Sequence, residues 1–195
     1  YPNLHSFQVE WDFVELPSQI FENWVWHPNS LKLIAKHYQT GANLPEEWIS
    51  KLTAKRQFMM GDFTLRQNEF GLLDIELHSL PEPPKSVEEL DRLCFELSNR
   101  YTLLPKTERY KMYAAFSHIF SGGYGAGYYS YLWAEMLEAD AFAEFEQNGV
   151  LNPETGSKFK KSVLEAGTSK PGIELFRDFT GREPSPEPLL RKKGI

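Results

Sequence analysis

The chain has 195 residues, of which 41% are hydrophobic and 25% are charged, and its net charge is −6. These values are typical of an ordinary globular protein with a substantial core. The acidic balance and the lack of a basic stripe argue against nucleic acid as a partner, and no run of 18 apolar residues is present that would cross a membrane. The single cysteine, Cys94, excludes a disulfide within the chain and favours a reducing compartment, the cytoplasm. Its apolar surroundings predict a buried, inert thiol.

Helical signals dominate the first half of the chain. A first helix is predicted over residues 14–27, with Pro17 in its first turn, where proline is tolerated. A short amphipathic helix follows at 31–38 and ends by Gly41. The stretch 45–80 is helical in pattern, with expected interruptions at Gly61 and Gly71. One face of that stretch is expected to carry Trp48, Leu52, Lys55, Met59 and Phe63.

The second half continues the helical pattern after a firm break at PEPP, residues 81–84. Ser86 and Glu89 form a capping box that opens a helix over 86–101. A long apolar helix covers 128–149, and another short helix begins at Asn152-Pro153. A further helix lies near 171–180, after which three prolines limit regular structure. Because alternation typical of strands is weak throughout, the sequence predicts an all-α fold.

Two glutamates lie seven residues apart in the first predicted helix, within FVELPSQIFENWVW at 13–26. Glu15 and Glu22 therefore share nearly the same helix face. A carboxylate among aromatic and aliphatic side chains needs a partner or a metal, because burial of an unpaired charge is costly. On the residues alone, a solvated acidic edge of an amphipathic helix is the favoured interpretation, and a metal ligand is the alternative.

A glycine-rich segment at 118–131, HIFSGGYGAGYYSY, holds one histidine, four glycines and four tyrosines. Its glycines suit a flexible loop whose backbone approaches a ligand closely. No strand precedes it and no Lys-Ser/Thr pair follows it, so a phosphate-binding loop is disfavoured. Tyrosine hydroxyls can donate hydrogen bonds to an oxyanion without changing charge. A packing loop with tyrosines in the core is an equal alternative at this point.

Other chemistry-bearing residues form no recognisable constellation. The remaining histidines are scattered and are expected to be surface or internally satisfied polar residues: His5, His27, His37 and His78. Asp74 and Glu76 are expected to be charges on a helix surface. No serine stands in a nucleophile elbow with histidine and aspartate partners.

Taken together, the two segments resemble the thimet oligopeptidase, oligopeptidase A and dipeptidyl carboxypeptidase family of zinc peptidases. The stretch DFVELPSQIFENW at 12–24 is similar to the family's glutamate helix, and FSHIFSGGYGAGYYSYLW at 116–133 is similar to its substrate-binding loop and following helix. The resemblance covers nearly the whole chain. It implies that residues 1–195 are the multi-helix, all-α C-terminal portion of a zincin-type oligopeptidase catalytic domain.

The resemblance also implies roles for individual residues. Glu15 matches the glutamate that joins two histidines of an HExxH helix as the third zinc ligand. His118, Tyr124 and Tyr131 match catalytic loop residues that bind the substrate backbone and the oxyanion. Further substrate-binding positions are Gly122, Gly123 and Tyr128. Glu22 shares the face of Glu15, and a role in supporting that ligand is inferred from this placement.

The sequence departs from the family pattern because it contains no HExxH motif. In the family this motif lies roughly two dozen residues before the glutamate, whereas only fourteen residues precede Glu15 here. We therefore expect the chain to begin inside the catalytic domain. A single glutamate does not make a zinc site, so the isolated chain is expected to bind zinc poorly and to cleave nothing.

The expected function is zinc-dependent hydrolysis of short peptides by the full-length enzyme, with one zinc ion. Endopeptidase action and release of C-terminal dipeptides both remain open. The alternatives are a non-catalytic helical module that binds a peptide or a partner protein, and, less favoured, a helical nucleotide-binding protein. A face exposed by truncation could also drive a non-native dimer.

Overall fold

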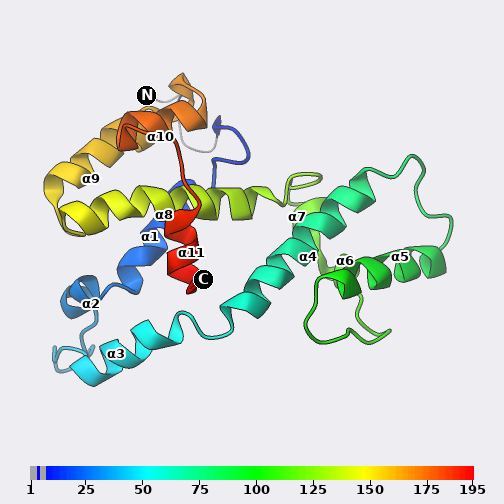
Figure 1. The fold of residues 1–195 in the computed structure, drawn as a ribbon, viewed down its shortest axis with the longest axis horizontal. Coiled ribbons are helices and arrows are strands. Elements are labelled where there is room, and N and C mark those ends of the chain that lie inside the picture. The colour runs from blue at the N-terminus through cyan, green and yellow to red at the C-terminus, as the bar shows by residue number, and fades with distance from the viewer. Residues whose placement is uncertain (1–3, 5–7) are drawn as a thin grey trace. The chain divides into compact units, whose positions relative to one another are not determined.

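The structure is a computed structural model that describes residue 4 and residues 8–195. Within these residues the regular structure consists of eleven α-helices with short 3-10 and π turns, and the only β-type pairing is an isolated antiparallel bridge between Lys36 and Asn43. The prediction of an all-α fold is therefore confirmed. The helices (Figure 1) are α1 (Leu16–Glu22), α2 (Pro28–Ile34), α3 (Glu46–Lys55), α4 (Met60–His78), α5 (Val87–Arg100), α6 (Met112–Ala115), α7 (Ser117–Phe120), α8 (Ser130–Asn148), α9 (Pro153–Phe159), α10 (Gly172–Thr180) and α11 (Glu187–Lys193).

The chain divides into two compact units, which are described separately. Unit 1 holds the described residues up to Phe58 together with Trp133–Ile195, and unit 2 holds Met59–Leu132. None of the helices in the described part of the chain is both long enough and apolar enough to cross a membrane.

Unit 1 is built around an aromatic core. Side chains of α1, α8, α9 and α10 form one buried cluster, in which Phe142 and Phe145 come from α8 and Phe179 from α10. Trp24 joins this cluster: its ring meets those of Phe142 and Phe145 edge-on, at 4.9 Å each. The Trp24 indole N–H also donates to the carbonyl of Val150 at 2.8 Å, which satisfies the one polar group of this large apolar side chain.

Unit 2 has its own core, where α4 packs against α5. Phe70 and Leu73 of α4 meet Cys94 and Leu97 of α5, and Phe116 and Ile119, which precede the first glycine of the glycine-rich segment, complete the buried cluster. The prediction of a buried thiol is confirmed, because Cys94 is 4% exposed. Burial raises the pKa of this thiol to about 11.

Several helix boundaries follow the predicted end signals. Ser86 accepts a hydrogen bond from the Glu89 amide at 3.2 Å at the start of α5, which is one half of the capping box, while the Glu89 carboxylate accepts from the Lys85 amide at 2.9 Å. The α8 helix ends at Asn148, directly before Gly149, whose φ is +97°. Asn152 then accepts from the first amides of α9.

The start of the first helix differs from the prediction. α1 begins at Leu16, so Glu15 stands immediately before it. Pro17 has no N–H to donate to the carbonyl of Phe13, and the Leu16 amide bonds that carbonyl in a tighter turn at 3.1 Å. Glu15 thereby occupies the N-cap position of α1, without a capping hydrogen bond from its side chain.

The second helix was also placed incorrectly. α2 covers Pro28–Ile34 because the His27 ring accepts from the Asn29 amide, with proline at the first helical position. After Ile34 the chain folds back, and the Ala35 carbonyl accepts from the Leu44 amide at 2.9 Å.

Three further predictions were wrong. The stretch 45–80 breaks at Met59, which has a φ of +62°, and Gly61 and Gly71 both lie inside α4. The predicted apolar face is not the buried one, since Ile49 is buried while Trp48 is exposed. The three prolines near the C-terminus do not prevent α11, because Pro188 sits in its first turn, where no amide is needed.

Candidate functional site

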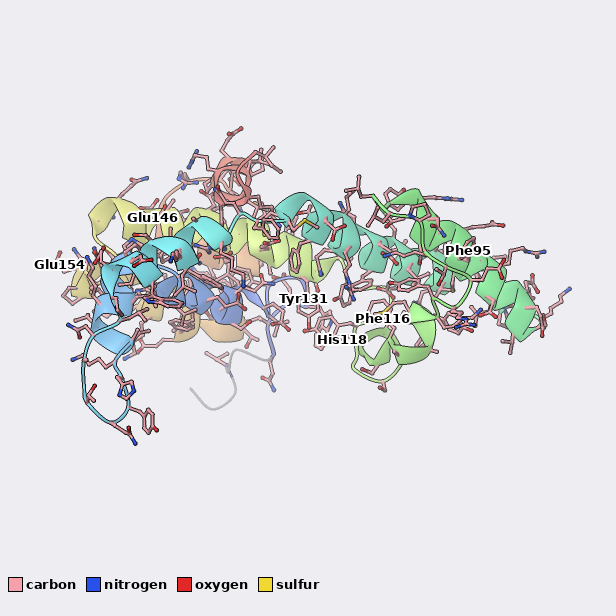
Figure 2. The ribbon with its side chains drawn as sticks, turned by 90° about the horizontal axis from the view of Figure 1, so that it is seen from below. Phe95, Phe116, His118, Tyr131, Glu146 and Glu154 are labelled. Carbon is pink, nitrogen blue, oxygen red and sulfur yellow. The ribbon has the colours of Figure 1, made fainter. Side chains whose placement is uncertain are left out.

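Four of the aromatic residues singled out in the glycine-rich segment lie together in unit 2. The rings of Tyr124 and Tyr131 stack with centroids 4.8 Å apart, and Tyr128 lies 5.0 Å from Tyr131. His118 is 5.7 to 6.0 Å from each of the three phenol rings. Figure 2 shows His118 near Tyr131, with Phe116 beside it. We call His118, Tyr124, Tyr128 and Tyr131 the ring cluster.

Local backbone bonds shape the loop that carries these rings. The His118 carbonyl accepts from the Tyr124 amide at 2.9 Å, and the Tyr124 carbonyl accepts from the Gly127 amide at 2.9 Å. Gly122 is required by close approach, because a Cβ there would lie 2.9 Å from the His118 Cα. Gly123 has a φ of +83°, which favours glycine. The glycines therefore serve a compact, internally bonded loop.

The ring cluster offers hydrogen-bond donors in a partly dry environment. Tyr124 is buried, Tyr128 and Tyr131 are half-buried, and His118 is exposed. Burial raises the pKa of the Tyr128 phenol above its ordinary value, and the neighbouring Tyr131 adds to the effect. The Tyr128 hydroxyl is thus protonated at neutral pH and can donate a hydrogen bond. Neutral donors of this kind suit an oxyanion that forms nearby.

Asp74 was predicted to be a helix-surface charge, and this prediction was wrong. Its side chain, on α4, is fully buried. The carboxylate accepts from the Ala126 amide and from the Tyr128 amide, each at 2.8 Å. His78 Nδ1 lies 2.8 Å from the same carboxylate. A trace of this role is visible in the sequence, since Asp74 interrupts the apolar run FGLLDIEL and pairs with a histidine four residues later.

Glu15 lies in unit 1, directly before α1, and is half-buried. The Ser18 hydroxyl lies 2.9 Å from both the Glu15 carbonyl oxygen and its Oε2 atom, and its one proton can be donated to either. The sequence reasoning did not identify Ser18. A carboxylate oxygen is a ligand that zinc accepts, so Glu15 fits one position of a zinc site.

The remaining predicted positions are placed as follows. Glu22 is the last residue of α1 and is exposed. His27 and His37 accept from nearby backbone amides in turns, as expected of satisfied polar residues. Glu76 is exposed, as predicted. His5 lies outside the described residues. No group of three or more His, Cys, Asp or Glu side chains that could hold a metal ion occurs in residue 4 and residues 8–195.

The whole chain, residues 1–195, matches the model of peptidase family M3. It is 48% identical over 193 residues to organellar oligopeptidase A of Arabidopsis thaliana, covering 96% of this chain and 24% of that protein. It is 46% identical over 187 residues to oligopeptidase A of Escherichia coli (strain K12), covering 96% and 27%.

A third relative is the dipeptidyl carboxypeptidase of the same bacterium, with 36% identity over 199 residues, 100% of this chain and 29% of that protein. The chain thus spans about a quarter of the length of the curated relatives it matches. Because the family model matches the chain over its full length, the chain belongs to peptidase family M3.

Proposed function

We propose that the full-length protein hydrolyses short peptides with the help of zinc, and that this chain supplies one metal ligand and the donors that face the reacting carbonyl. The observation that carries the proposal is the ring cluster of this family M3 chain. The His118 ring lies 5.7 to 6.0 Å from the three tyrosine rings, and the Tyr131 ring lies 4.8 Å from Tyr124 and 5.0 Å from Tyr128. Family membership favours this enzyme over a non-catalytic binding module and over a nucleotide-binding protein.

The metal side of the proposal rests on Glu15. Its carboxylate would hold the zinc together with two histidines supplied from outside this chain. Ser18 would keep the carboxylate in one orientation through its 2.9 Å hydrogen bond. When bound, zinc would polarise the peptide carbonyl and lower the pKa of a water molecule.

The loop side of the proposal rests on donors. Tyr131 and Tyr124 would donate from their hydroxyls to the oxyanion, and His118 would bind the substrate backbone or the oxyanion from the exposed edge of the ring cluster. Gly122, Gly123 and Tyr128 would line the substrate-binding part of the loop. Losing one donor to an oxyanion costs on the order of 100- to 1000-fold in rate.

The role of Glu15 is tested by substitution in the full-length protein. Glu15→Gln removes the charge and should lower both the zinc content and the peptidase activity to near background. Glu46→Gln is the matched control, because Glu46 is a surface glutamate of unit 1 that pairs with Lys32. Metal analysis and peptide cleavage are measured together. Full zinc content in Glu15→Gln would remove Glu15 from the metal site.

Glu22 has a weaker part in the proposal. It would support Glu15 from the end of α1 without binding the metal. Loss of such a supporting group typically weakens metal affinity about 10- to 100-fold. Glu22→Gln should therefore lower zinc affinity by that factor, and a competition titration with a chelator measures it. Unchanged affinity would make Glu22 a solvated surface charge.

The proposed substrates are short peptides. The relatives bear the names oligopeptidase A and dipeptidyl carboxypeptidase, so both internal cleavage and release of dipeptides fit the proposal. A cytoplasmic location is also proposed. It is supported by the single, buried, free thiol of Cys94, which suits a reducing compartment.

A further inference from the structure

Unit 2 contains a buried carboxylate that neither the sequence resemblance nor the proposed mechanism uses. Asp74 is 0% exposed, although it comes from α4, more than fifty residues before its partners in the loop. Its Oδ1 atom accepts from the Ala126 amide and its Oδ2 atom from the Tyr128 amide, each at 2.8 Å. Both oxygens of one carboxylate are thus committed to the backbone of the glycine-rich loop.

The loop backbone at this point has a conformation that needs outside support. Ala126 has a φ of +55°, a left-handed value that a residue with a side chain rarely adopts. This turn aims the amides of Ala126 and Tyr128 at the same carboxylate, and such paired amides form a natural binding place for an anion. The anion here is supplied by the protein itself.

The loop is also in close contact with its surroundings at Gly125, the residue before Ala126. A Cβ at Gly125 would lie 3.1 Å from His78 Nε2 and 3.1 Å from the Ile119 carbonyl, so the loop passes close to α4 at this point. His78 Nδ1 approaches the Asp74 carboxylate to 2.8 Å. Asp74 therefore holds the loop against α4, and His78, one turn later on the same helix, contacts the Asp74 carboxylate.

The held residues lie between the two tyrosines of the proposed oxyanion site. Ala126 and Tyr128 stand between Tyr124 and Tyr131 in the chain, and the rings of these two tyrosines stack at 4.8 Å. The amide of Tyr128 donates to Asp74, and the ring of the same residue lies 4.9 Å from Phe116 and 5.0 Å from Tyr131. A shift of the backbone at 126–128 would consequently move the Tyr128 ring and disturb its contact with Tyr131.

We propose that Asp74 is a positioning residue for catalysis. It does not touch the substrate, and it acts by fixing the loop backbone so that the hydroxyls of Tyr124 and Tyr131 meet the reacting carbonyl. This inference rests on the proposed function of the ring cluster. A misplacement of about 1 Å costs on the order of 100-fold in rate, so the effect of releasing the loop is measurable.

The test compares two substitutions on α4 in the full-length enzyme. Asp74→Asn keeps the size of the side chain, but its amide group cannot accept from both loop amides. Glu76→Gln makes the same change of charge at an exposed position two residues away. We expect Asp74→Asn to accelerate hydrogen exchange of the Ala126 and Tyr128 amides and to lower kcat on the order of 100-fold. The change in KM should be smaller, and Glu76→Gln should match the wild type in all three measurements.

Two outcomes of this comparison would overturn the inference. Unchanged exchange at Ala126 and Tyr128 would show that Asp74 does not hold the loop. Accelerated exchange with an unchanged kcat would show that it holds the loop without serving catalysis. Failure of the proposed function has a different signature, because the wild-type enzyme itself would then lack chelator-sensitive peptide cleavage.

Asp74→Glu provides a second variant in case Asp74→Asn does not fold. It keeps both acceptor oxygens but moves them by one methylene group. The loop amides should then stay protected while kcat still falls, because the loop is held in a shifted position. A role in stability alone would leave kcat unchanged whenever protection is kept, and that result would overturn the inference.

Discussion

The rings of Tyr124 and Tyr131 stack at 4.8 Å with their planes inclined by 28°. This contact uses the aromatic faces, whereas the proposed chemistry uses the hydroxyl groups. Tyr131→Phe therefore keeps the stacking and removes only the donor. In the full-length enzyme we expect kcat to fall on the order of 100- to 1000-fold, with a much smaller rise in KM.

Steady-state kinetics on a short peptide measure this effect. Tyr129→Phe is the matched control, since Tyr129 is an exposed tyrosine two residues away that takes no part in the ring cluster. Its kinetic constants should equal those of the wild type. If Tyr131→Phe also keeps its kcat, Tyr131 has no role at the oxyanion.

Gly122 provides a steric test of the loop. A Cβ at this position would lie 2.9 Å from the His118 Cα and 3.0 Å from its carbonyl oxygen, so Gly122→Ala must displace the backbone that carries His118. We expect kcat/KM to fall on the order of 100-fold. Gly61→Ala, inside α4 with nothing within 4 Å of the new Cβ, should keep its activity and gain up to about 1 kcal/mol of stability. Equal activity of the two variants would contradict the steric argument.

The buried ion pair of Asp140 is expected to contribute more to the free energy of unfolding than an exposed ion pair does. This fully buried carboxylate of α8 accepts from Nη1 and Nη2 of Arg182 and from the Ser185 amide, each at 2.7 Å. Asp140→Ala should lower the free energy of unfolding by about 2 to 3 kcal/mol, a value moderated because Arg182 is partly exposed.

Asp178→Ala serves as the comparison, because Asp178 pairs with Lys170 at 2.6 Å on the exposed surface. That loss should be below about 1 kcal/mol. Chemical denaturation of the full-length protein measures both. Similar losses for the two variants would mean that the Asp140 contacts do not fix the segment before α11.

The buried thiol of Cys94 leads us to expect that its alkylation rate and its contribution to stability depend on pH. Burial raises its thiol pKa from 9.0 to about 11, and only the thiolate reacts with alkylating agents. At pH 8, alkylation of the native protein should be roughly 100-fold slower than after unfolding, because the pKa differs by about two units. The stabilising contribution of the buried neutral thiol is complete below pH 9 and is lost as the pH rises toward 11.

Mass spectrometry of the peptide that carries Cys94 follows this reaction site by site. The same sample in urea is the control. Equal rates in the native and the unfolded protein at pH 8 would contradict burial of the thiol.

Residues 1–195 expressed alone give a further prediction. With a single carboxylate ligand, the chain should bind zinc far below one ion per molecule and should cleave no peptide. Metal analysis after gel filtration is the measurement, and light scattering on the same sample shows whether the chain alone forms a dimer. Stoichiometric zinc, or cleavage that a chelator abolishes, would contradict the prediction.

The sequence by itself determined the helical class, the N-cap at Ser86, the end of α8 at Gly149 and the burial of Cys94. These features depend on apolar periodicity and on hydrogen bonds or backbone angles within a few residues, which the order of amino acids displays directly. The residues of the ring cluster were also visible, because they are neighbours along the chain.

Only the tertiary structure decided the burial of Asp74 and its hydrogen bonds to the loop. Its partners, the amides of Ala126 and Tyr128, lie more than fifty residues away in the sequence, and backbone amides leave no mark in the amino-acid code. The break between α3 and α4 at Met59 could not be predicted either, because methionine has no preference for the left-handed backbone that gives it a φ of +62°. Local chemistry can be read from the chain, whereas the burial of a charge depends on which distant backbone folds against it.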